Sequence, residues 1–286
     1  MSSTQGPARP PLRDIIREFD LGAKRRFGQH FLLDANLTRK IANAAGDLSK
    51  GSVIEIGPGP GGLTRALLDA HAKRVIAVEL DPRCVAALEG LVAESQGRLT
   101  IIEGDALTVA LAEIAPPPRR IVANLPYNVA TPLLLQWLAV AEHFEEMVLM
   151  FQKEVADRLC AKPGSKAYGR LSIVAQWRME ITPLFDIGPK AFVPPPKVSS
   201  TVLRLRTRAK PIAAAGGAID IVTLGRVTRA AFGQRRKMLR SSLKTLGVEV
   251  GAALLEETGI SPTVRAEELR VEDFCALARA LARRKA

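Results

Sequence analysis

The sequence predicts an α/β protein, with a doubly wound, Rossmann-like domain followed by a small domain made only of helices. Between residues 52 and 152, short β-branched runs alternate with segments whose apolar residues recur every three or four positions. These runs are apolar along most of their length, which is typical of strands buried on both faces of a parallel sheet. After residue 218 the helical spacing continues alone to the end of the chain.

Seven strands are expected, and helices join the first five of them. The expected strands are 52–57, 74–80, 99–105, 120–125, 147–152, 178–187 and 200–207. The helical segments between the first five strands are 63–71, 82–95 and 131–141. Alternation of strands and helices of this kind places a ligand at the carboxyl ends of the strands.

The chain is expected to divide into three parts. Residues 1–22 begin with a stretch rich in proline and serine, and we expect them to be a disordered tail. Residues 23–208 form the Rossmann-like domain and residues 209–286 the helical domain, because "AKPIAAAGGA" at 209–218 has the composition of a linker. The expected helices of the last part are 221–232, 238–246, 252–258 and 271–284.

The composition is that of an ordinary globular protein, with 47% apolar and 24% charged residues among 286. No apolar run approaches the roughly 20 residues that span a bilayer, and the N-terminus has no segment of signal-peptide type. We therefore expect a cytoplasmic protein. Three scattered cysteines and three scattered histidines form neither a disulfide framework nor a metal-binding motif, so we expect no bound metal.

The net charge is +12, from 41 Lys and Arg against 29 Asp and Glu. Most of the excess lies in residues 204–244, which hold eleven basic residues and one acidic residue, a net charge of 11 − 1 = +10. A basic balance of this size favours a polyanionic partner, and nucleic acid is the commonest one in a cytoplasm. The alternative is a solvated basic face without a partner, which the clustering of the charges disfavours.

A glycine turn follows the first expected strand, in the sequence "EIGPGPGG" from Glu55 to Gly62. The turn opens a helix, which is the context that a nucleotide-binding turn requires. Gly57, Gly59 and Gly61 let the main chain approach a ligand without a Cβ in the way. Tight packing of a strand on a helix would also use such a turn, so the motif alone leaves both explanations open.

Acidic residues end the next two strands. Glu79 lies 79 − 57 = 22 residues after Gly57, where an acid is placed to accept hydrogen bonds from ribose hydroxyls. Asp105, followed by Ala106, lies at the same rim and can accept from an adenine amino group. Asp81 is equally well explained as the cap of the next helix. The three strand ends fit an adenosine-containing ligand, either a dinucleotide or S-adenosylmethionine.

The fourth strand ends in Asn124-Leu125-Pro126-Tyr127, a quartet that favours methyl transfer to an exocyclic amine. The N6 nitrogen of adenine is a poor nucleophile because its lone pair is delocalised into the ring. The Asn124 side-chain oxygen and a neighbouring carbonyl aimed by Pro126 can accept its two N–H bonds and favour a pyramidal transition state. Tyr127 can stack on a flipped-out base. A plain turn with an Asx motif is the alternative.

With these motifs the sequence resembles a known family, the S-adenosylmethionine-dependent adenine N6-dimethyltransferases of ribosomal RNA. The resemblance runs from about Arg25 to the C-terminus. It rests on "RRFGQHFL", "EIGPGPGGLT", "NLPYNVATPLL", "QKEVADRL", "SKAYGRLS" and "AFVPPPKVSS". In the last third, "AFGQRRKMLRSSLK" and "RAEEL" resemble the small-subunit (16S) branch rather than the large-subunit, antibiotic-resistance branch.

The resemblance implies S-adenosylmethionine as the methyl donor and a set of site residues. The implied cofactor-binding residues are His30, Leu32, Gly57, Gly59, Glu79, Asp105, Ala106 and Asn124. The implied catalytic residues are Asn124, Leu125, Pro126, Tyr127 and Phe192. Phe192 would pack on the target base, although a core aromatic is the alternative there. His30 is a departure, because the family more often has Asn at this position.

The same resemblance implies a reaction and a partner. Two adjacent adenosines in a hairpin near the 3′ end of small-subunit rRNA would be dimethylated within immature 30S particles by a monomeric enzyme. The implied RNA-binding residues are Lys197, Arg235, Arg236 and Lys237, which would contact phosphate without reading sequence.

Two other classes of function remain open on the sequence. The first is an assembly factor that acts chiefly by occupying immature small subunits, although such a protein need not keep Asn-Leu-Pro-Tyr intact. The second is a DNA adenine methyltransferase. It is disfavoured by the lack of a separate sequence-reading domain and by Leu125, where those enzymes commonly have a second proline.

Overall fold

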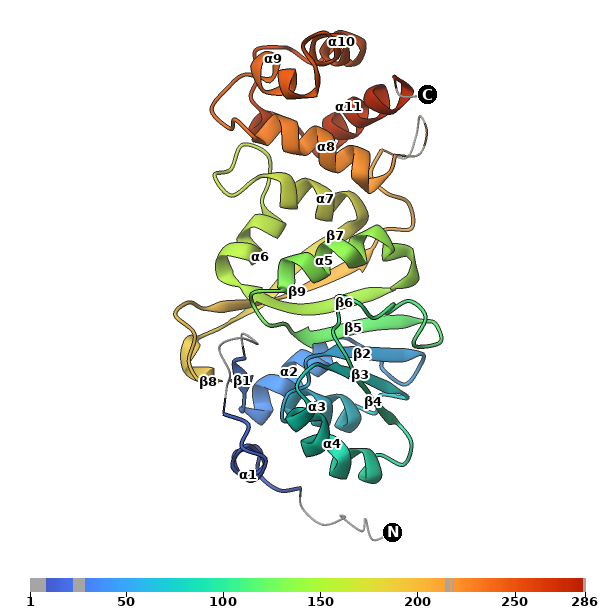
Figure 1. Ribbon diagram of the computed structural model, residues 1–286, viewed down its shortest axis with the longest axis vertical. Coiled ribbons are helices and arrows are strands. Elements are labelled where there is room, and N and C mark those ends of the chain that lie inside the picture. The colour runs from blue at the N-terminus through green and yellow to red at the C-terminus, as the bar shows by residue number, and fades with distance from the viewer. Residues whose placement is uncertain (1–8, 23–28, 214–216, 218, 285–286) are drawn as a thin grey trace. The chain divides into compact units, whose positions relative to one another are not determined.

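The structure, a computed structural model, describes residues 9–22, 29–213, 217 and 219–284 (Figure 1). The chain forms two compact units. The first unit extends to Gln136 and includes His143–Gln152 and Leu184–Arg204. The second unit consists of Trp137–Glu142, Lys153–Pro183 and the chain from Leu205 onward.

A seven-stranded sheet has the strand order β4-β3-β2-β5-β6-β9-β7 (Figure 1). Its strands are β2 Ser52–Ile56, β3 Val75–Glu79, β4 Leu99–Glu103, β5 Arg119–Asn124, β6 Glu146–Gln152, β7 Met179–Ile187 and β9 Ser200–Thr207. All seven strands expected from the sequence are present, which confirms the Rossmann-like class. The strands from β4 to β6 pair in parallel, so their carboxyl ends meet at one edge. Strand β4 departs from the predicted burial, because it is an edge strand in which only Leu99 is buried.

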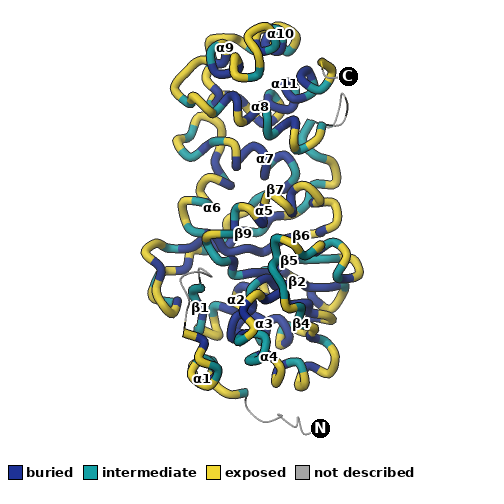
Figure 2. Tube along the Cα trace, viewed as in Figure 1, coloured by how far each residue is buried: buried dark blue, intermediate teal, exposed yellow. Residues whose placement is uncertain are grey.

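Helices connect these strands at the expected places. They are α3 Gly62–Asp69, α4 Pro82–Glu94 and α5 Ala130–Ala139, and α2 Ala35–Ala44 precedes β2. Asp81 caps α4, accepting from the Arg83 N–H at 3.2 Å and pairing with the Arg83 guanidinium at 2.7 Å. The core of the first unit joins Leu67 and Leu88 of the helices to Val122 of the sheet, all buried (Figure 2).

One helix corrects the expected disordered tail. Leu12–Glu18 forms α1, and Ile15 and Leu21 are buried in an apolar cluster with Phe31. The proline and serine content that suggested disorder lies before and at the start of this helix, whereas Ile15 and Leu21 supply apolar surface that packing can bury. Residues 1–8, the first part of the expected tail, lie outside the described residues.

Two short strands that the sequence did not predict pair with each other. Strand β1, Phe31–Leu32, lies antiparallel to β8, Phe192–Val193, which follows the 3₁₀ turn Pro189–Ala191. Successive residues of a strand point to opposite faces. Phe192 therefore turns into the core of the first unit and is 2% exposed, whereas Val193 is 47% exposed.

The second unit is mainly helical, although it also includes the first part of β7 and the last part of β9. Its helices are α6 Lys153–Cys160, α7 Arg170–Arg178, α8 Ile221–Phe232, α9 Leu239–Ser242, α10 Val248–Thr258 and α11 Val271–Arg283, with 3₁₀ turns at Leu243–Leu246 and Ala266–Glu268. The 3₁₀ turn Ala141–His143 lies where the two units meet along the chain. Trp177 of α7 and Tyr168 share one buried core with Phe274 of α11 (Figure 2). This unit is therefore larger than the predicted segment 209–286, because α6 and α7 contribute to it. Across the described residues, no helix has the length and apolar character needed to cross a membrane.

Candidate active site

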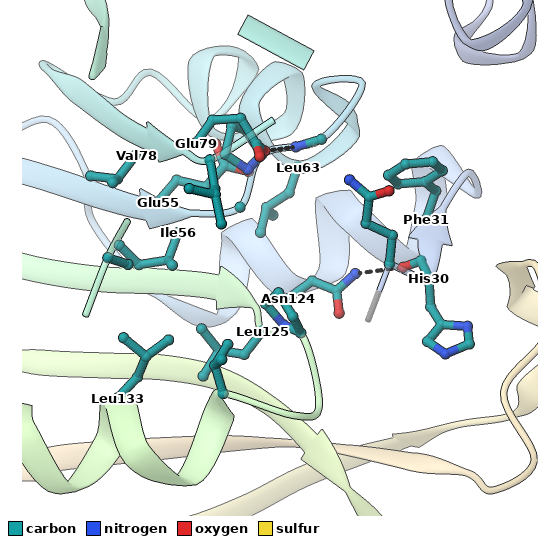
Figure 3. Close-up of a pocket in the computed structure, with 18 of the residues that line it drawn as sticks. His30, Phe31, Glu55, Ile56, Leu63, Val78, Glu79, Asn124, Leu125 and Leu133 are labelled. Carbon is teal, nitrogen blue, oxygen red and sulfur yellow. Dashed lines mark hydrogen bonds between the residues drawn. The ribbon is translucent and has the colours of Figure 1, made fainter. Parts of the chain in front are cut away.

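A cavity of about 350 Å³ lies at the carboxyl edge of the parallel strands in the first unit (Figure 3). Its size falls in the range of small-molecule and cofactor pockets. The structure brings most of the predicted site residues into its wall. Those that line it are His30, Leu32, Gly57, Gly59, Glu79, Asp105, Ala106, Asn124, Leu125, Pro126 and Tyr127.

The glycine turn forms one wall of this cavity. Gly57, Gly59 and Gly61 have φ of 65°, 56° and 89°, a left-handed conformation that glycine adopts without strain. A Cβ on Gly59 would lie 3.0 Å from the ring of Phe31. The turn therefore needs glycine both for its conformation and for close packing, and it still presents its main chain to the cavity.

Glu79 joins the end of β3 to the glycine turn. Its carboxylate, labelled in Figure 3, accepts from the Gly59 N–H at 3.0 Å. It also accepts from the Asp81 N–H at 2.8 Å. Burial disfavours the charged form and raises the pKa of Glu79, while these N–H donors oppose that shift. Each oxygen keeps a second lone pair, so the carboxylate can accept further hydrogen bonds from a ligand.

Glu55 is a buried acid in the cavity wall that the sequence reasoning missed. It is 1% exposed, and its Oε2 has no hydrogen-bond partner among the described residues. Burial raises the pKa of Glu55 to about 8, and the nearby charge of Glu79 adds to the shift. Glu55 is therefore protonated near neutral pH. The signal was a single charged residue inside the otherwise apolar strand run "SVIEI".

Asp105 lies just after the end of β4, where the sequence predicts a contact with the adenine of a cofactor. Its Oδ1 accepts from the Leu107 N–H at 2.9 Å, which fixes the carboxylate at the rim of the cavity. Ala106 lines the cavity beside it. The described contacts leave Oδ2 of Asp105 free to accept a hydrogen bond from a ligand.

Asn124 lies at the tip of β5 and is oriented by the N-terminal segment. Its Nδ2 donates to the main-chain carbonyl of His30 at 3.2 Å (Figure 3). Because Nδ2 is engaged there, Oδ1 is left as an acceptor toward the cavity. The next residues begin α5: the carbonyl of Pro126 accepts from the N–H groups of Val129 and Ala130 at 3.1 and 3.0 Å.

The ring of His30 lies on the Tyr127 side of the site. The two rings are stacked, with centroids 5.3 Å apart and planes inclined by 30°. His30 Nδ1 also contacts the carbonyl of Pro194 at 2.8 Å, so this nitrogen carries the proton of that hydrogen bond. Tyr127 is held further by its hydroxyl, 2.7 Å from Ser200 Oγ, and burial raises the pKa of Tyr127. The predicted contact of the His30 side chain with a cofactor stays a prediction.

The remaining predicted residues lie outside the cavity wall. Phe192 is buried in the core through the pairing of β8 with β1, so its predicted contact with a target base stays a prediction. Lys197 is exposed on the loop after β8. In the second unit, Arg235 forms an ion pair with Glu267 at 2.8 Å and donates to the Ser165 carbonyl at 3.3 Å.

The sequence reasoning also missed two polar residues that support the site. Ser200 holds the Tyr127 hydroxyl, and Gln29 donates to Asp81 at 3.4 Å. Both lie inside motifs that carried the family resemblance, but nothing in their spacing indicated these partners. Within the part of the chain that the structure describes, no group of three or more His, Cys, Asp or Glu residues could hold a metal ion.

The sheet, the glycine turn, the two strand-end acids and the Asn-Leu-Pro-Tyr tip define a Rossmann-like methyltransferase. Comparison with known proteins identifies which kind. The chain belongs to the ribosomal RNA adenine dimethylase family, whose sequence model matches residues 21–283.

Individual relatives agree with this assignment. The chain is 62% identical to the "Ribosomal RNA small subunit methyltransferase A" of Paramagnetospirillum magneticum, over 95% of both chains. It is 58% identical to the protein of the same name from Rhodospirillum rubrum, over 98% of this chain and 95% of the relative. A dimethyladenosine transferase from Plasmodium falciparum has a similar structure, with a TM-score of 0.77 and 26% identity over 90% of this chain and 98% of the other. The 23S rRNA methyltransferase ErmE gives a TM-score of 0.65 at 26% identity, covering 88% and 99%.

Proposed function

We propose that this protein transfers methyl groups from S-adenosylmethionine to the N6 amines of two adjacent adenosines in a hairpin near the 3′ end of small-subunit rRNA. The product is N6,N6-dimethyladenosine. The observation that carries the proposal is that Asn124 lines the cavity and donates from Nδ2 to the main-chain carbonyl of His30, which leaves Oδ1 as an acceptor for a substrate amine. The names of the relatives from Paramagnetospirillum magneticum and Rhodospirillum rubrum support the small subunit as the source of the substrate.

The residues of the cavity fit S-adenosylmethionine. The free lone pairs of Glu79 suit ribose hydroxyls, and Asp105 Oδ2 suits an adenine amino group. Gly57 and Gly59 line the same cavity and have no side chain, so a polar ligand can approach their main chain closely. When bound, the cofactor supplies a methyl group on a positively charged sulfur, which is already a good leaving group.

The acceptor amine is held by groups that strand β5 presents. Asn124 Oδ1 and the carbonyl of Leu125 accept its two N–H bonds, which draws the nitrogen toward the pyramidal geometry of the transition state. Pro126 has no N–H and a fixed φ, so it sets the direction of the Leu125 carbonyl. Tyr127 stacks on the flipped-out adenine. The amine loses its proton only after the new N–C bond forms, so no dedicated base is required.

RNA is held by exposed cations outside the cavity. Lys197, Arg236 and Lys237 are exposed and form no ion pair within the described residues, which supports a contact with phosphate for each. Arg235 was predicted with them, but its pairing with Glu267 supports a structural role as well. We propose that the helical segment 209–286 provides most of this binding, that the enzyme acts as a monomer, and that it acts on immature 30S particles in the cytoplasm.

A choice of substrates tests the proposal. The protein is incubated with labelled S-adenosylmethionine and, separately, with small subunits from a strain that lacks this gene, with large-subunit rRNA, and with duplex DNA. We expect label only in the small subunits, in adenosines that yield N6,N6-dimethyladenosine on digestion. Equal or preferred labelling of either other substrate would overturn the assignment, and binding to small subunits without labelling would favour an assembly factor.

A further inference from the structure

A hollow of about 430 Å³ on the second unit carries two arginines and no acidic residue in its wall. Arg226 and Arg229 lie three positions apart on α8, so their side chains emerge from one face of the helix. The rest of the wall comes from the end of α8 and the 3₁₀ turn that follows α9. It includes Gly233, Gln234, Thr245 and Leu246.

Neither arginine is neutralised by the protein. In the described part of the second unit, the side chains of Arg226 and Arg229 form no ion pair and no hydrogen bond. The hollow therefore holds two guanidinium groups for which the described residues supply no counter-charge.

Three other arginines of the same unit do have an acidic partner. Arg235 pairs with Glu267 at 2.8 Å, and Arg284 pairs with Glu257 at 3.0 Å. Arg283 also pairs with Glu257. Carboxylates of the same unit thus offset the charge of these three arginines. The absence of an acid around Arg226 and Arg229 then points to a partner that supplies the negative charge itself.

The chemistry of the hollow indicates phosphate. A guanidinium group offers two parallel N–H donors that match two phosphate oxygens. The hollow has no aromatic side chain on which a base would stack. Gln234 in its wall is followed along the chain by the exposed Arg236 and Lys237, and several cations in one segment suit a polyanion with regularly repeated charges.

We propose that Arg226 and Arg229 form a phosphate-binding notch that holds the sugar–phosphate backbone of RNA. The notch acts on the backbone and not on base sequence, so it fixes how the RNA lies on the enzyme. This inference rests on the proposed function only in taking rRNA as the natural ligand. It adds a binding site that is separate from the methyl-transfer cavity.

The test compares two charge-matched double variants of the full chain. The first variant, Arg226→Gln with Arg229→Gln, removes both positive charges of the notch. The second, Arg283→Gln with Arg284→Gln, removes the same amount of charge at a place where both arginines pair with Glu257. Binding to small subunits from a strain that lacks this gene is measured between 50 and 200 mM salt, a range over which phosphate contacts change affinity strongly. Each lost phosphate contact lowers the slope of log K against log salt by about 0.7 to 0.9. We expect a fall of about 1.5 and a several-fold loss of affinity for the notch variant, and little change for its match.

The outcomes separate this inference from the proposed function. If affinity and salt slope changed equally in both double variants, the effect would come from overall charge, and the proposed notch would be overturned. If the notch variant lost affinity for polyglutamate but kept its affinity for RNA, the proposed RNA-binding role would be overturned in favour of an acidic protein partner. Single replacements of Arg226 or Arg229 should each give about half of the slope change. These single variants test the proposal even if the double variant does not fold. If the wild-type protein binds RNA through the notch but methylates none, the proposed function fails and the notch stands.

Discussion

The side-chain amide of Asn124 donates to the main-chain carbonyl of His30 at 3.2 Å, across 94 positions of sequence. An amide group can present either its N–H₂ or its oxygen to a ligand, and the two choices have opposite chemistry. By engaging Nδ2, the N-terminal segment selects the oxygen for the cavity. The orientation of the Asn124 amide thus depends on a main-chain group and is independent of the residue type at position 30.

Asn124→Asp tests this orientation. Aspartate keeps the shape of the side chain but cannot donate to the His30 carbonyl, so a carboxylate oxygen would face a carbonyl oxygen at close range. Loss of one oriented group in a transition state typically costs roughly 100-fold to 1,000-fold in kcat. We expect a loss of that size in single-turnover methylation, with affinity for S-adenosylmethionine changed less than fivefold. If the methylation rate and the affinity for S-adenosylmethionine fell by the same factor, Asn124 would act in cofactor binding alone.

His30→Ala separates the ring of this residue from its carbonyl. The variant keeps the acceptor for Asn124 but loses the stack on Tyr127 and the hydrogen bond to Pro194. An aromatic pair contributes about 0.5 to 1.5 kcal/mol beyond its buried area, which corresponds to a rise of roughly threefold to tenfold in KM for RNA. Cofactor affinity, measured by calorimetry, should stay the same.

His30→Asn is the matched variant for this experiment. Asparagine can still donate to the Pro194 carbonyl but offers no ring to Tyr127, so we expect an intermediate KM for RNA. A loss of cofactor affinity in the alanine variant would show instead that the His30 side chain reaches the cofactor, as the family resemblance implies.

Much of this site could be predicted because parallel strands bring their carboxyl ends to one edge. The β-branched runs located the strands. The residues at or just after the strand ends, Glu79, Asp105 and Asn124, therefore had to lie together. No local pattern could predict the pairing of β1 with β8. Each strand has two residues, and their pairing depends on contacts made across about 160 positions.

That pairing decides how two predicted site residues lie. It buries Phe192, which the family resemblance placed against a target base, and the carbonyl of the nearby Pro194 accepts a hydrogen bond from His30. Arg235 is a similar case. In the sequence it is one of three adjacent cations, and only the folded chain brings Glu267 to it.

Glu79→Gln should weaken cofactor binding by more than the loss of one ligand contact. The carboxylate accepts from both Gly59 and Asp81, whereas a glutamine offers one oxygen and sets its N–H₂ group against the second N–H. Hydrogen bonds to a charged group contribute about 1.5 to 3 kcal/mol, so affinity should fall roughly 10-fold to 100-fold in calorimetry. Glu103→Gln is the matched control, because Glu103 is exposed at the end of the neighbouring strand. Similar losses in both variants would remove the special role of Glu79.

Glu55→Gln should change how stability depends on pH. Burial raises the pKa of Glu55 from an ordinary value of 4.5 to about 8. Below 4.5 the folded and unfolded chains both hold this proton. Between 4.5 and about 8 only the folded chain holds it, so the free energy of unfolding falls as the pH rises, by up to roughly 1.4 kcal/mol per pH unit. Glutamine cannot ionise and removes this fall.

The measurement is urea unfolding of the wild type and of Glu55→Gln at pH 5, 6, 7 and 8. The stability of the variant relative to the wild type should rise steadily across this range and level off above about pH 8, where Glu55 is ionised in both states. Glu103→Gln, exposed in the folded chain, should show a difference that does not change with pH. A difference between wild type and Glu55→Gln that stays constant from pH 5 to 8 would mean that Glu55 titrates normally. Its unpartnered Oε2 would then be solvated or paired in solution.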